Sequence, residues 1–240
     1  MEMKNKWIHP VLNPLPEKVA GVQKPVISLS GKGWEMKRGI TEEEIKCGRY
    51  MPEWREVTVP VQPELHPIEE KYAYRRYVTV PEDWNEKRIF LRFEGANGLA
   101  RIYLNGKQIK THYGGFVSWD CEITEFVRAG ETFLITVLME DKAGEISVFN
   151  YGGLVRDVLM YALPQTCLTR MHSDTVFDRD YMDAKLSVHL AVAGMIEAVR
   201  LTLTGEEGGA VSLGEIRQDE EGKAEFEVWV KKPKKWDCEH

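Results

Sequence analysis

The segment RIFLRFEGANGLARIYLNGK, residues 88–107, decides the fold class of this chain. Apolar side chains occupy alternate positions in both of its halves: Ile89, Leu91, Phe93, Ala100, Ile102 and Leu104. An alternation of period two is typical of a β-strand with one buried face. The Asn105-Gly106 pair that follows is the strongest short-range signal for a hairpin turn. We therefore predict two strands here, the second of which ends in a hairpin.

Patterns of the same kind fill most of the chain. Strand-like segments occur at residues 26–30, 55–61, 72–80, 133–139, 154–163, 184–192, 199–203 and 224–230. Proline cannot donate to a β-ladder, so Pro60 and Pro81 mark strand ends. Only residues 123–128 have the pattern of a helical turn, which stops at Gly130. The sequence therefore predicts an all-β protein, in which Pro164 marks the boundary between a larger domain and a small immunoglobulin-like sandwich.

The composition argues against several classes of function. The net charge is −6, from 32 basic and 38 acidic residues, which disfavours nucleic acid as a partner. The four cysteines are dispersed without a C-x-x-C pair, so we predict reduced thiols and no metal site. Gly31-Lys32-Gly33 is too short for a phosphate-binding loop, and no cofactor is predicted.

The same sequence gives an expectation about location. No apolar run approaches the roughly 20 residues that cross a bilayer, so no membrane contact is predicted. The first ten residues lack the apolar region of a signal peptide. We therefore expect a cytoplasmic protein, although a chain that had lost its signal peptide would look the same.

Five segments then occur in order along the first two thirds of the chain. They are Tyr74–Tyr77 followed by Val80-Pro81, Leu91–Asn97, Tyr103–Lys107, Gly114–Phe116 and Gly152–Val158. Any one of these segments is a weak signal. Together they resemble the N-terminal half of glycoside hydrolase family 2, the family of β-galactosidases and β-glucuronidases, which has the same series of strand ends, hairpin and glycine-rich loop.

The resemblance implies a particular domain order. Residues 49–163 would form a sugar-binding, galactose-binding-like jelly-roll β-sandwich, and residues 164–240 a smaller immunoglobulin-like β-sandwich. Residues 1–48 would be an N-terminal extension that packs on the jelly roll. Pro233–Trp236 looks like the Asn-Pro-x-x-Trp segment of the family's second domain. The short stretch between Pro60 and Tyr72 lacks a Trp that is common there, which leaves the subfamily and the sugar open.

The catalytic machinery of the family has no counterpart in these 240 residues. Retaining glycosidases use two carboxylates about 5–5.5 Å apart, and in this family both lie on a TIM barrel, which takes about 250 residues of alternating strands and helices. The only Asn-Glu pair, Asn85-Glu86, lies in a predicted turn. The resemblance therefore implies a parent enzyme that hydrolyses O-glycosyl bonds, whereas we expect the present chain to be inactive alone and to hold no catalytic residue.

Three residues are predicted to contact substrate in a complete enzyme: Asn97, Asp178 and Asp180. Asn97 matches the family position where a jelly-roll loop lends an Asn side chain to the active site, and its alternative role is that of a turn residue beside Gly98. Asp178 and Asp180 lie where some members offer a carboxylate to a sugar hydroxyl, and their alternative role is that of solvated loop acids.

Other side chains have two interpretations that the sequence leaves open. His112 precedes the Gly114-Gly115 loop and is either part of a sugar site or a partly buried loop histidine. Trp54 and Trp119 either stack on a sugar ring or belong to the core.

The leading hypothesis is a non-catalytic N-terminal region of a β-galactosidase-like hydrolase. It would shape substrate subsites and make domain or oligomer contacts, with a β-linked glycoside, a catalytic TIM barrel and a second copy as partners. The alternatives are an independent carbohydrate-binding module, which requires a preformed groove with exposed aromatic rings, and a purely structural or interaction protein, which requires an exposed apolar patch.

Overall fold

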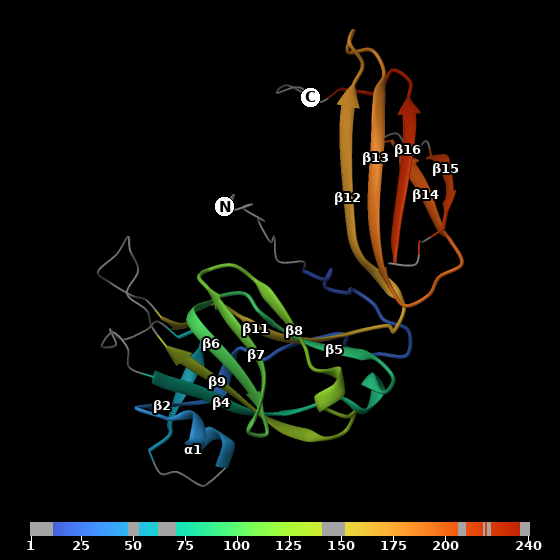
Figure 1. The fold of residues 1–240 in the computed structure, drawn as a ribbon. Coiled ribbons are helices and arrows are strands. Elements are labelled where there is room, and N and C mark those ends of the chain that lie inside the picture. Colours follow the sequence, from blue (N-terminus) through green and yellow to red (C-terminus); the bar gives the residue numbers. More distant parts are fainter. Residues whose placement is uncertain are drawn as a thin grey trace, which may run out of the picture. The chain divides into compact units, whose positions relative to one another are not determined.

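A computed structural model of the chain describes residues 12–47, 53–61, 71–140, 152–205, 210–217, 219 and 222–235. The chain divides into two compact units, Met1–Pro164 and Gln165–His240. Both units are built of antiparallel β-strands, which confirms the predicted all-β sandwich class (Figure 1). No helix among the described residues is long and apolar enough to cross a membrane.

The first unit is a sandwich of two sheets. The smaller sheet has the order β1 (Val26–Ser28), β11 (Val158–Leu163), β5 (Arg88–Phe93) and β8 (Trp119–Glu122). The larger sheet has the order β10 (Gly153–Leu154), β6 (Ala96–Leu104), β9 (Thr132–Glu140), β4 (Lys71–Thr79), β2 (Gly31–Arg38) and β3 (Arg55–Val59), and β7 (Lys107–Gly114) pairs with β6. Short 3₁₀ turns η1 (Glu82–Trp84) and η2 (Thr124–Phe126) connect strands.

A single hydrophobic core fills the space between these sheets. Leu91 and Met160 come from the smaller sheet, and Met36, Tyr74 and Ile135 from the larger one. Every one of these side chains is at most 2% exposed, as expected for a closely packed interior. The predicted alternation in residues 88–104 therefore marks the core-facing side of β5 and β6.

The turn after β6 has the conformation that its sequence predicts. Asn105 has a φ of 48° and Gly106 a φ of 82°, the left-handed pair that a two-residue hairpin requires. The Asn105 side chain also accepts a hydrogen bond from the Leu134 backbone N–H at 2.8 Å, which ties the hairpin to β9.

The predicted single strand over residues 154–163 is wrong. It is two strands, because the chain leaves the larger sheet after β10 and enters the smaller sheet at β11. Between them, the Val155 and Arg156 backbone N–H groups donate to the Gly95 carbonyl at 3.0 and 3.3 Å. These bonds satisfy the backbone where the strand changes sheet.

Residues before position 48 supply two elements besides the predicted strand. β2 lies inside the larger sheet, where the buried Trp34 indole donates to the Leu29 carbonyl at 2.6 Å. Helix α1 (Glu42–Cys47) covers part of the outer face of that sheet. It begins with a capping box, because Thr41 and Glu44 each accept a hydrogen bond from the other's backbone N–H.

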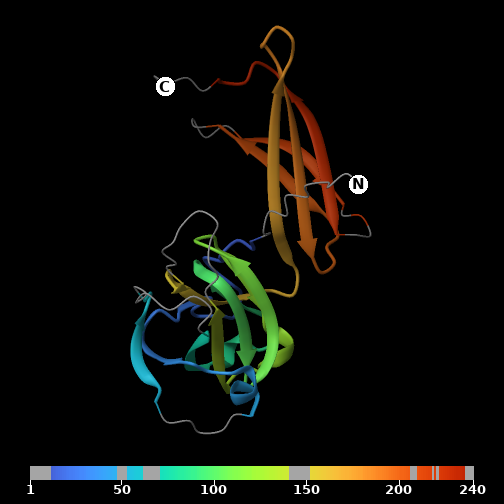
Figure 2. The same cartoon turned by 60° about the vertical axis from the view of Figure 1, so that its left-hand side comes forward.

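The second unit has a smaller core. β12 (Cys167–Phe177), β13 (Ala184–Ala193) and β16 (Lys223–Val230) form one sheet, and β14 (Val199–Thr204) and β15 (Ala210–Ile216) form another, as Figures 1 and 2 show. The buried side chains of its described core are Val188, Leu190 and Ala224. Trp236 of the predicted Pro-x-x-Trp segment lies outside the described residues.

Candidate functional site

Three of the sequence motifs meet at the start of β6. Asn97 pairs with Gly153 of β10, and Gly98 pairs with Gly114 of β7, so β10 begins and β7 ends here. Segments that lie up to about 60 residues apart in the sequence are therefore hydrogen-bonded neighbours at one end of the larger sheet. We call this group of residues, 95–98, 113–117 and 153–156, the Asn97 end.

Glycine is required at the Asn97 end because neighbouring side chains lie very close to the backbone there. A Cβ on Gly114 would lie 2.6 Å from His112 Nε2, and a Cβ on Gly153 would lie 2.7 Å from Tyr74 Oη. Gly153 also has a φ of 113°, which favours glycine. At Gly95 a Cβ would be about 3.0 Å from the Arg156 side chain. The glycines of the motifs are therefore explained by packing around β6 and its neighbours.

Asn97 itself is a strand residue and not the turn residue that its alternative role required. Its backbone is extended and half-buried, and the left-handed conformation is taken by the next residue, Gly98, at a φ of 114°. Gly115 passes directly beside the amide, since a Cβ there would lie 3.5 Å from Asn97 Oδ1. The Gly-Gly-aromatic loop and the Asn97 side chain thus belong to one surface.

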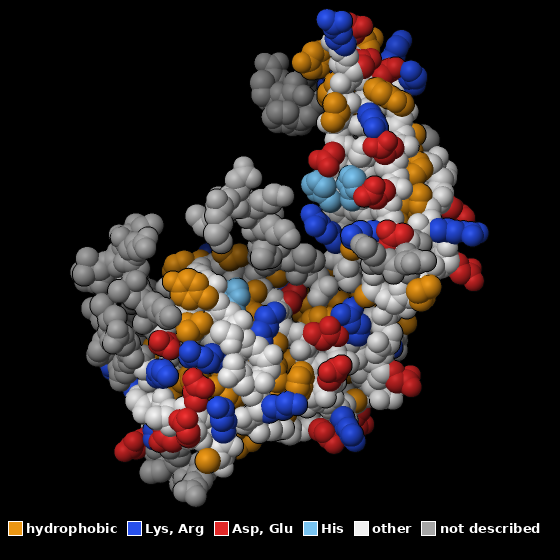
Figure 3. Space-filling model, in the orientation of Figure 1, with side chains coloured by type: hydrophobic (Ala, Val, Ile, Leu, Met, Phe, Trp, Pro, Cys, Tyr) orange, Lys and Arg blue, Asp and Glu red, His pale blue; other side chains and the backbone are white. Residues whose placement is uncertain are grey.

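Exposed apolar side chains border this surface. Tyr113, Phe116 and Val117 are 66, 51 and 57% exposed. The Arg156 guanidinium lies over the Phe116 ring at 6.0 Å, a cation–π contact that neither motif predicts alone. In Figure 3, hydrophobic side chains gather at the loop that follows β7. A ring beside an amide and a guanidinium can receive either the apolar face of a sugar or a second apolar protein surface.

His112 and Trp119 are structural residues beneath this loop. The Trp119 ring is stacked between Phe93 at 4.5 Å and His112 at 4.3 Å. Trp119 is 2% exposed, so of its two interpretations the core role is the one that fits the structure. Burial and the nearby Lys110 lower the pKa of His112, which keeps the imidazole neutral at pH 7.

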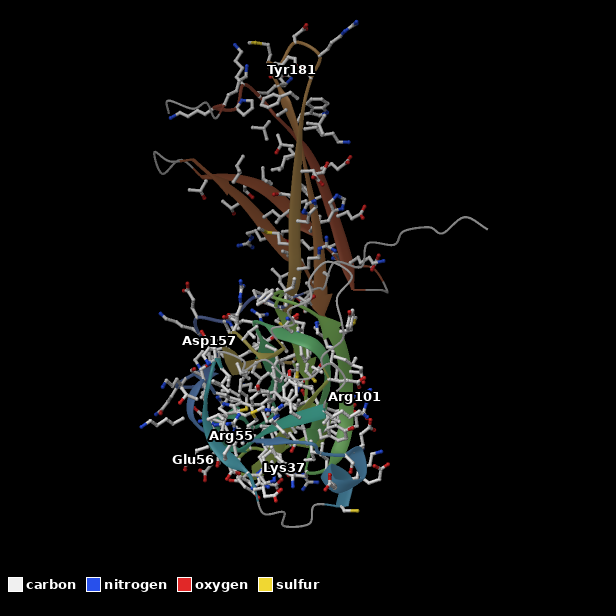
Figure 4. All side chains as sticks on the ribbon, turned by 90° about the vertical axis from the view of Figure 1, so that its left-hand side faces the viewer. Lys37, Arg55, Glu56, Arg101, Asp157 and Tyr181 are labelled. Carbon is white, nitrogen blue, oxygen red and sulfur yellow. The ribbon has the colours of Figure 1, made fainter. Side chains whose placement is uncertain are left out.

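The structure places Asp178 and Asp180 in the second unit, in the turn between β12 and β13. The Asp178 carboxylate accepts hydrogen bonds from the Met182 and Asp183 backbone N–H groups at 2.7 and 3.1 Å. Asp178 is therefore occupied in holding the turn. Asp180 is an exposed residue next to Tyr181, which Figure 4 labels at the tip of the turn.

Arg156 is a further residue of the Asn97 end that the sequence analysis did not assign to it. Its aliphatic part packs on Gly95 and its guanidinium covers Phe116, so the Arg of the Gly-x-x-Arg-Asp-Val strand holds the loop against β6. The contact joins residues 40 or more positions apart. A contact between residues so far apart leaves no local pattern in the sequence, so the sequence alone could not predict it.

Comparison with known proteins agrees with this geometry. A family model described as "Glycosyl hydrolases family 2, sugar binding domain" matches residues 43–164, which is half of the chain. The chain belongs to glycoside hydrolase family 2. Its first unit therefore contains the family's sugar-binding domain.

Relatives and solved structures of this family resemble the chain over different spans. A β-glucuronidase of Bacteroides fragilis is 36% identical over 104 residues, 40% of this chain and 15% of that protein. A putative β-glucuronidase of Formosa agariphila is 26% identical over 70% of this chain and 21% of its own length. A β-glucuronidase structure from Bifidobacterium dentium superposes with a TM-score of 0.71, at 22% identity, over 88% of this chain and 42% of that chain. The chain thus spans about a fifth of the length of these curated family 2 relatives.

Proposed function

We propose that this chain is the non-catalytic, substrate-orienting region of a family 2 glycosidase that cleaves β-linked glycosides. The observation that supports this role is the Asn97 end, where three family motifs surround one amide side chain. The Asn97 amide would hold the sugar in a fixed position relative to a catalytic TIM barrel. The two reacting carboxylates would come from that barrel.

The exposed loop beside Asn97 would make the contact with the barrel. Tyr113, Phe116 and Val117 are large apolar side chains in one short segment, and their burial against a second domain would be favourable. Such a contact would also bring the Asn97 amide to a fixed place relative to the reacting bond. Orientation of this kind lowers the activation barrier although the orienting residue forms no covalent bond with the substrate.

Asp180 is the second candidate contact to substrate. The Asp178 carboxylate is held by two backbone N–H groups, whereas Asp180 is exposed at the tip of the same turn. A carboxylate that is free to accept sugar O–H groups makes charge-assisted hydrogen bonds. We therefore assign to Asp180 the role that the sequence left open between the two aspartates.

A hybrid enzyme tests this function. The chain replaces the matching region of the Bacteroides fragilis β-glucuronidase, and hydrolysis of p-nitrophenyl β-glycosides is measured for the hybrid and for the chain alone. We expect hydrolysis by the hybrid and none by the chain alone. Hydrolysis by the chain alone, or a stable, folded hybrid without activity on any β-glycoside, would contradict the proposal.

A further inference from the structure

A hollow of about 670 Å³ lies on the outer face of the larger sheet, away from the sandwich core. Tyr74 and Val78 of β4 point into the core, so Arg75 and Tyr77 point outward by the alternation of the strand. The hollow lies beside helix α1, whose Ile45 forms part of its lining. Its volume is that of a typical small-molecule site.

The hollow is well separated from the Asn97 end. Its residue Thr136 pairs with Tyr103 on one side and with Arg75 on the other. Tyr103 is six residues beyond Asn97 on β6, a distance of about 20 Å along a strand. A ligand bound here would therefore leave the Asn97 end open.

The charges in the hollow are mostly paired within the protein. The Arg75 Nε donates to Glu35 at 2.6 Å, and its guanidinium covers the Trp54 ring at 4.1 Å. Arg76 donates to the Leu29 carbonyl, and Glu44 caps helix α1. Three carboxylates and two guanidiniums line the hollow, so no excess of positive charge recruits an anion.

Two exposed side chains, Tyr77 and Glu56, remain for a ligand, and the Trp54 indole also lines the hollow. Tyr77 is 67% exposed and presents an aromatic ring on the same face as Arg75. The Trp54 indole N–H is buried and has no hydrogen-bond partner among the described residues. Glu56 is an exposed residue of β3, directly opposite Glu35 in register, and Figure 4 shows it close to Arg55 at the margin of the unit.

We propose that this hollow is a second carbohydrate-binding site, specific for a neutral sugar. The apolar face of a pyranose would pack on the Tyr77 ring, as apolar surfaces do on flat aromatic groups. A ring hydroxyl would donate to the Glu56 carboxylate, and the environment of the Trp54 indole, which lines the hollow, would change on binding. The excess of carboxylates disfavours a uronate, because like charges repel in a partly desolvated site.

NMR of the whole chain tests the proposal, because the Trp54 indole N–H reports the site directly. Its resonance is identified by its absence in Trp54→Phe, which keeps an aromatic ring beneath Arg75. Lactose, cellobiose and glucuronate are each titrated to roughly 20 mM, above the roughly 1 mM dissociation constant expected of a weak single-sugar contact. We expect a saturable shift of the Trp54 resonance with one or both neutral disaccharides and none with glucuronate.

Matched variants separate this site from the Asn97 end. Tyr77→Ala should weaken binding about tenfold or more, and Glu56→Gln should weaken it less. Tyr113→Ala, an equally exposed tyrosine at the Asn97 end, and Asn97→Ala should leave the titration unchanged. The proposal is overturned by the absence of a Trp54 shift with both disaccharides, by equal binding of glucuronate, or by equal affinity in Tyr77→Ala.

Discussion

At the scale of single residues, the first unit holds a buried ion pair on several sides. Arg92 and Asp120 form an ion pair at 2.8 Å, and each side chain is 8% exposed. Hydrogen bonding to Asp120 raises the pKa of Arg92. The backbone of Asn13 completes the pair, donating to Asp120 at 3.0 Å and accepting from Arg92 at 2.5 Å. The pair thereby fixes the described N-terminal segment on the smaller sheet.

Asp120→Asn should therefore destabilise the first unit strongly. The neutral amide leaves the Arg92 charge buried without a counter-charge, which costs about 3 kcal/mol. Glu122→Gln is the matched control, because its bidentate pair with Arg88 is more exposed and should cost less than about 1 kcal/mol. Urea unfolding followed by tryptophan fluorescence measures both changes, and equal losses would contradict this assignment.

His112 gives the first unit a pH dependence of known sign. Burial lowers the pKa of the folded His112 below the ordinary value of 6.5, so the unfolded chain binds more protons just below that pH. Stability is then complete above about pH 6.5 and falls as the pH drops toward the folded pKa. We expect the urea midpoint to fall between pH 7 and 5.5, and less so in His112→Phe, which keeps the stack on Trp119.

A matched histidine controls for general acid effects. His189 is 45% exposed on β13 in the second unit, and His189→Gln should leave the pH dependence of the first unit intact. A wild-type midpoint that does not change with pH would show that His112 titrates normally when folded.

At the scale of elements, the change of sheet between β10 and β11 depends on Gly153. Gly153→Ala adds a methyl group 2.7 Å from Tyr74 Oη at a φ of 113° and should cost at least about 2 kcal/mol. Gly115→Ala is the comparison, because its φ is ordinary and its nearest neighbour, Asn97 Oδ1, would be 3.5 Å away. Thermal unfolding should show a large loss for the first variant and a small one for the second, and the reverse order would refute the packing described.

The elements also show how far sequence reasoning reaches. Alternation located β5, β6, β9 and β13, because apolar residues recur at every second position of each strand and pack on a core. It missed β2, where Gly31 and Gly33 have φ values of 89 and 93° and interrupt the pleat. Helix α1 carried a readable signal, the Thr41-x-x-Glu44 capping box, but its six residues are too few for a helical period.

The candidate site was also predictable only in part. Motif order selected Asn97, since the residue lies inside one of the matching segments. Its contacts with the loops at Gly115 and Gly153 come from sheet pairing between distant segments, which no local pattern contains. The outer hollow was missed because Trp54, Arg75 and Thr136 reach one place only through the register of β4 with β9 and the packing of Trp54 on Arg75.

At the scale of the whole molecule, the two units differ in how much apolar surface they bury. The first unit has a continuous core with fully buried Trp34 and Trp84, whereas in the second unit Met171, Val176 and Trp229 are 54–69% exposed. A small β-sandwich with few buried side chains has little to offset its conformational entropy. The second unit should therefore open at a lower free energy than the first.

Amide hydrogen exchange checks this difference. We expect protection factors in β4 and β9 to exceed those in β13 and β16 by about 100-fold, equivalent to roughly 2.7 kcal/mol. β4, β9 and β13 are each flanked on both sides by hydrogen-bonded strands, whereas β16 is an edge strand, so β13 gives the matched comparison. Equal protection in the two units would mean that they unfold as one.

The most direct test of the account is the effect of Asn97→Ala on catalysis by the hybrid enzyme. The control is Asn85→Ala, an exposed asparagine in the turn between β4 and β5. Loss of an orienting hydrogen bond should lower kcat/KM about 10- to 100-fold, or roughly 1.4–2.7 kcal/mol of transition-state stabilisation. The control should keep the activity of the parent hybrid. Equal activity of the two variants would contradict the claim that the Asn97 end orients the substrate.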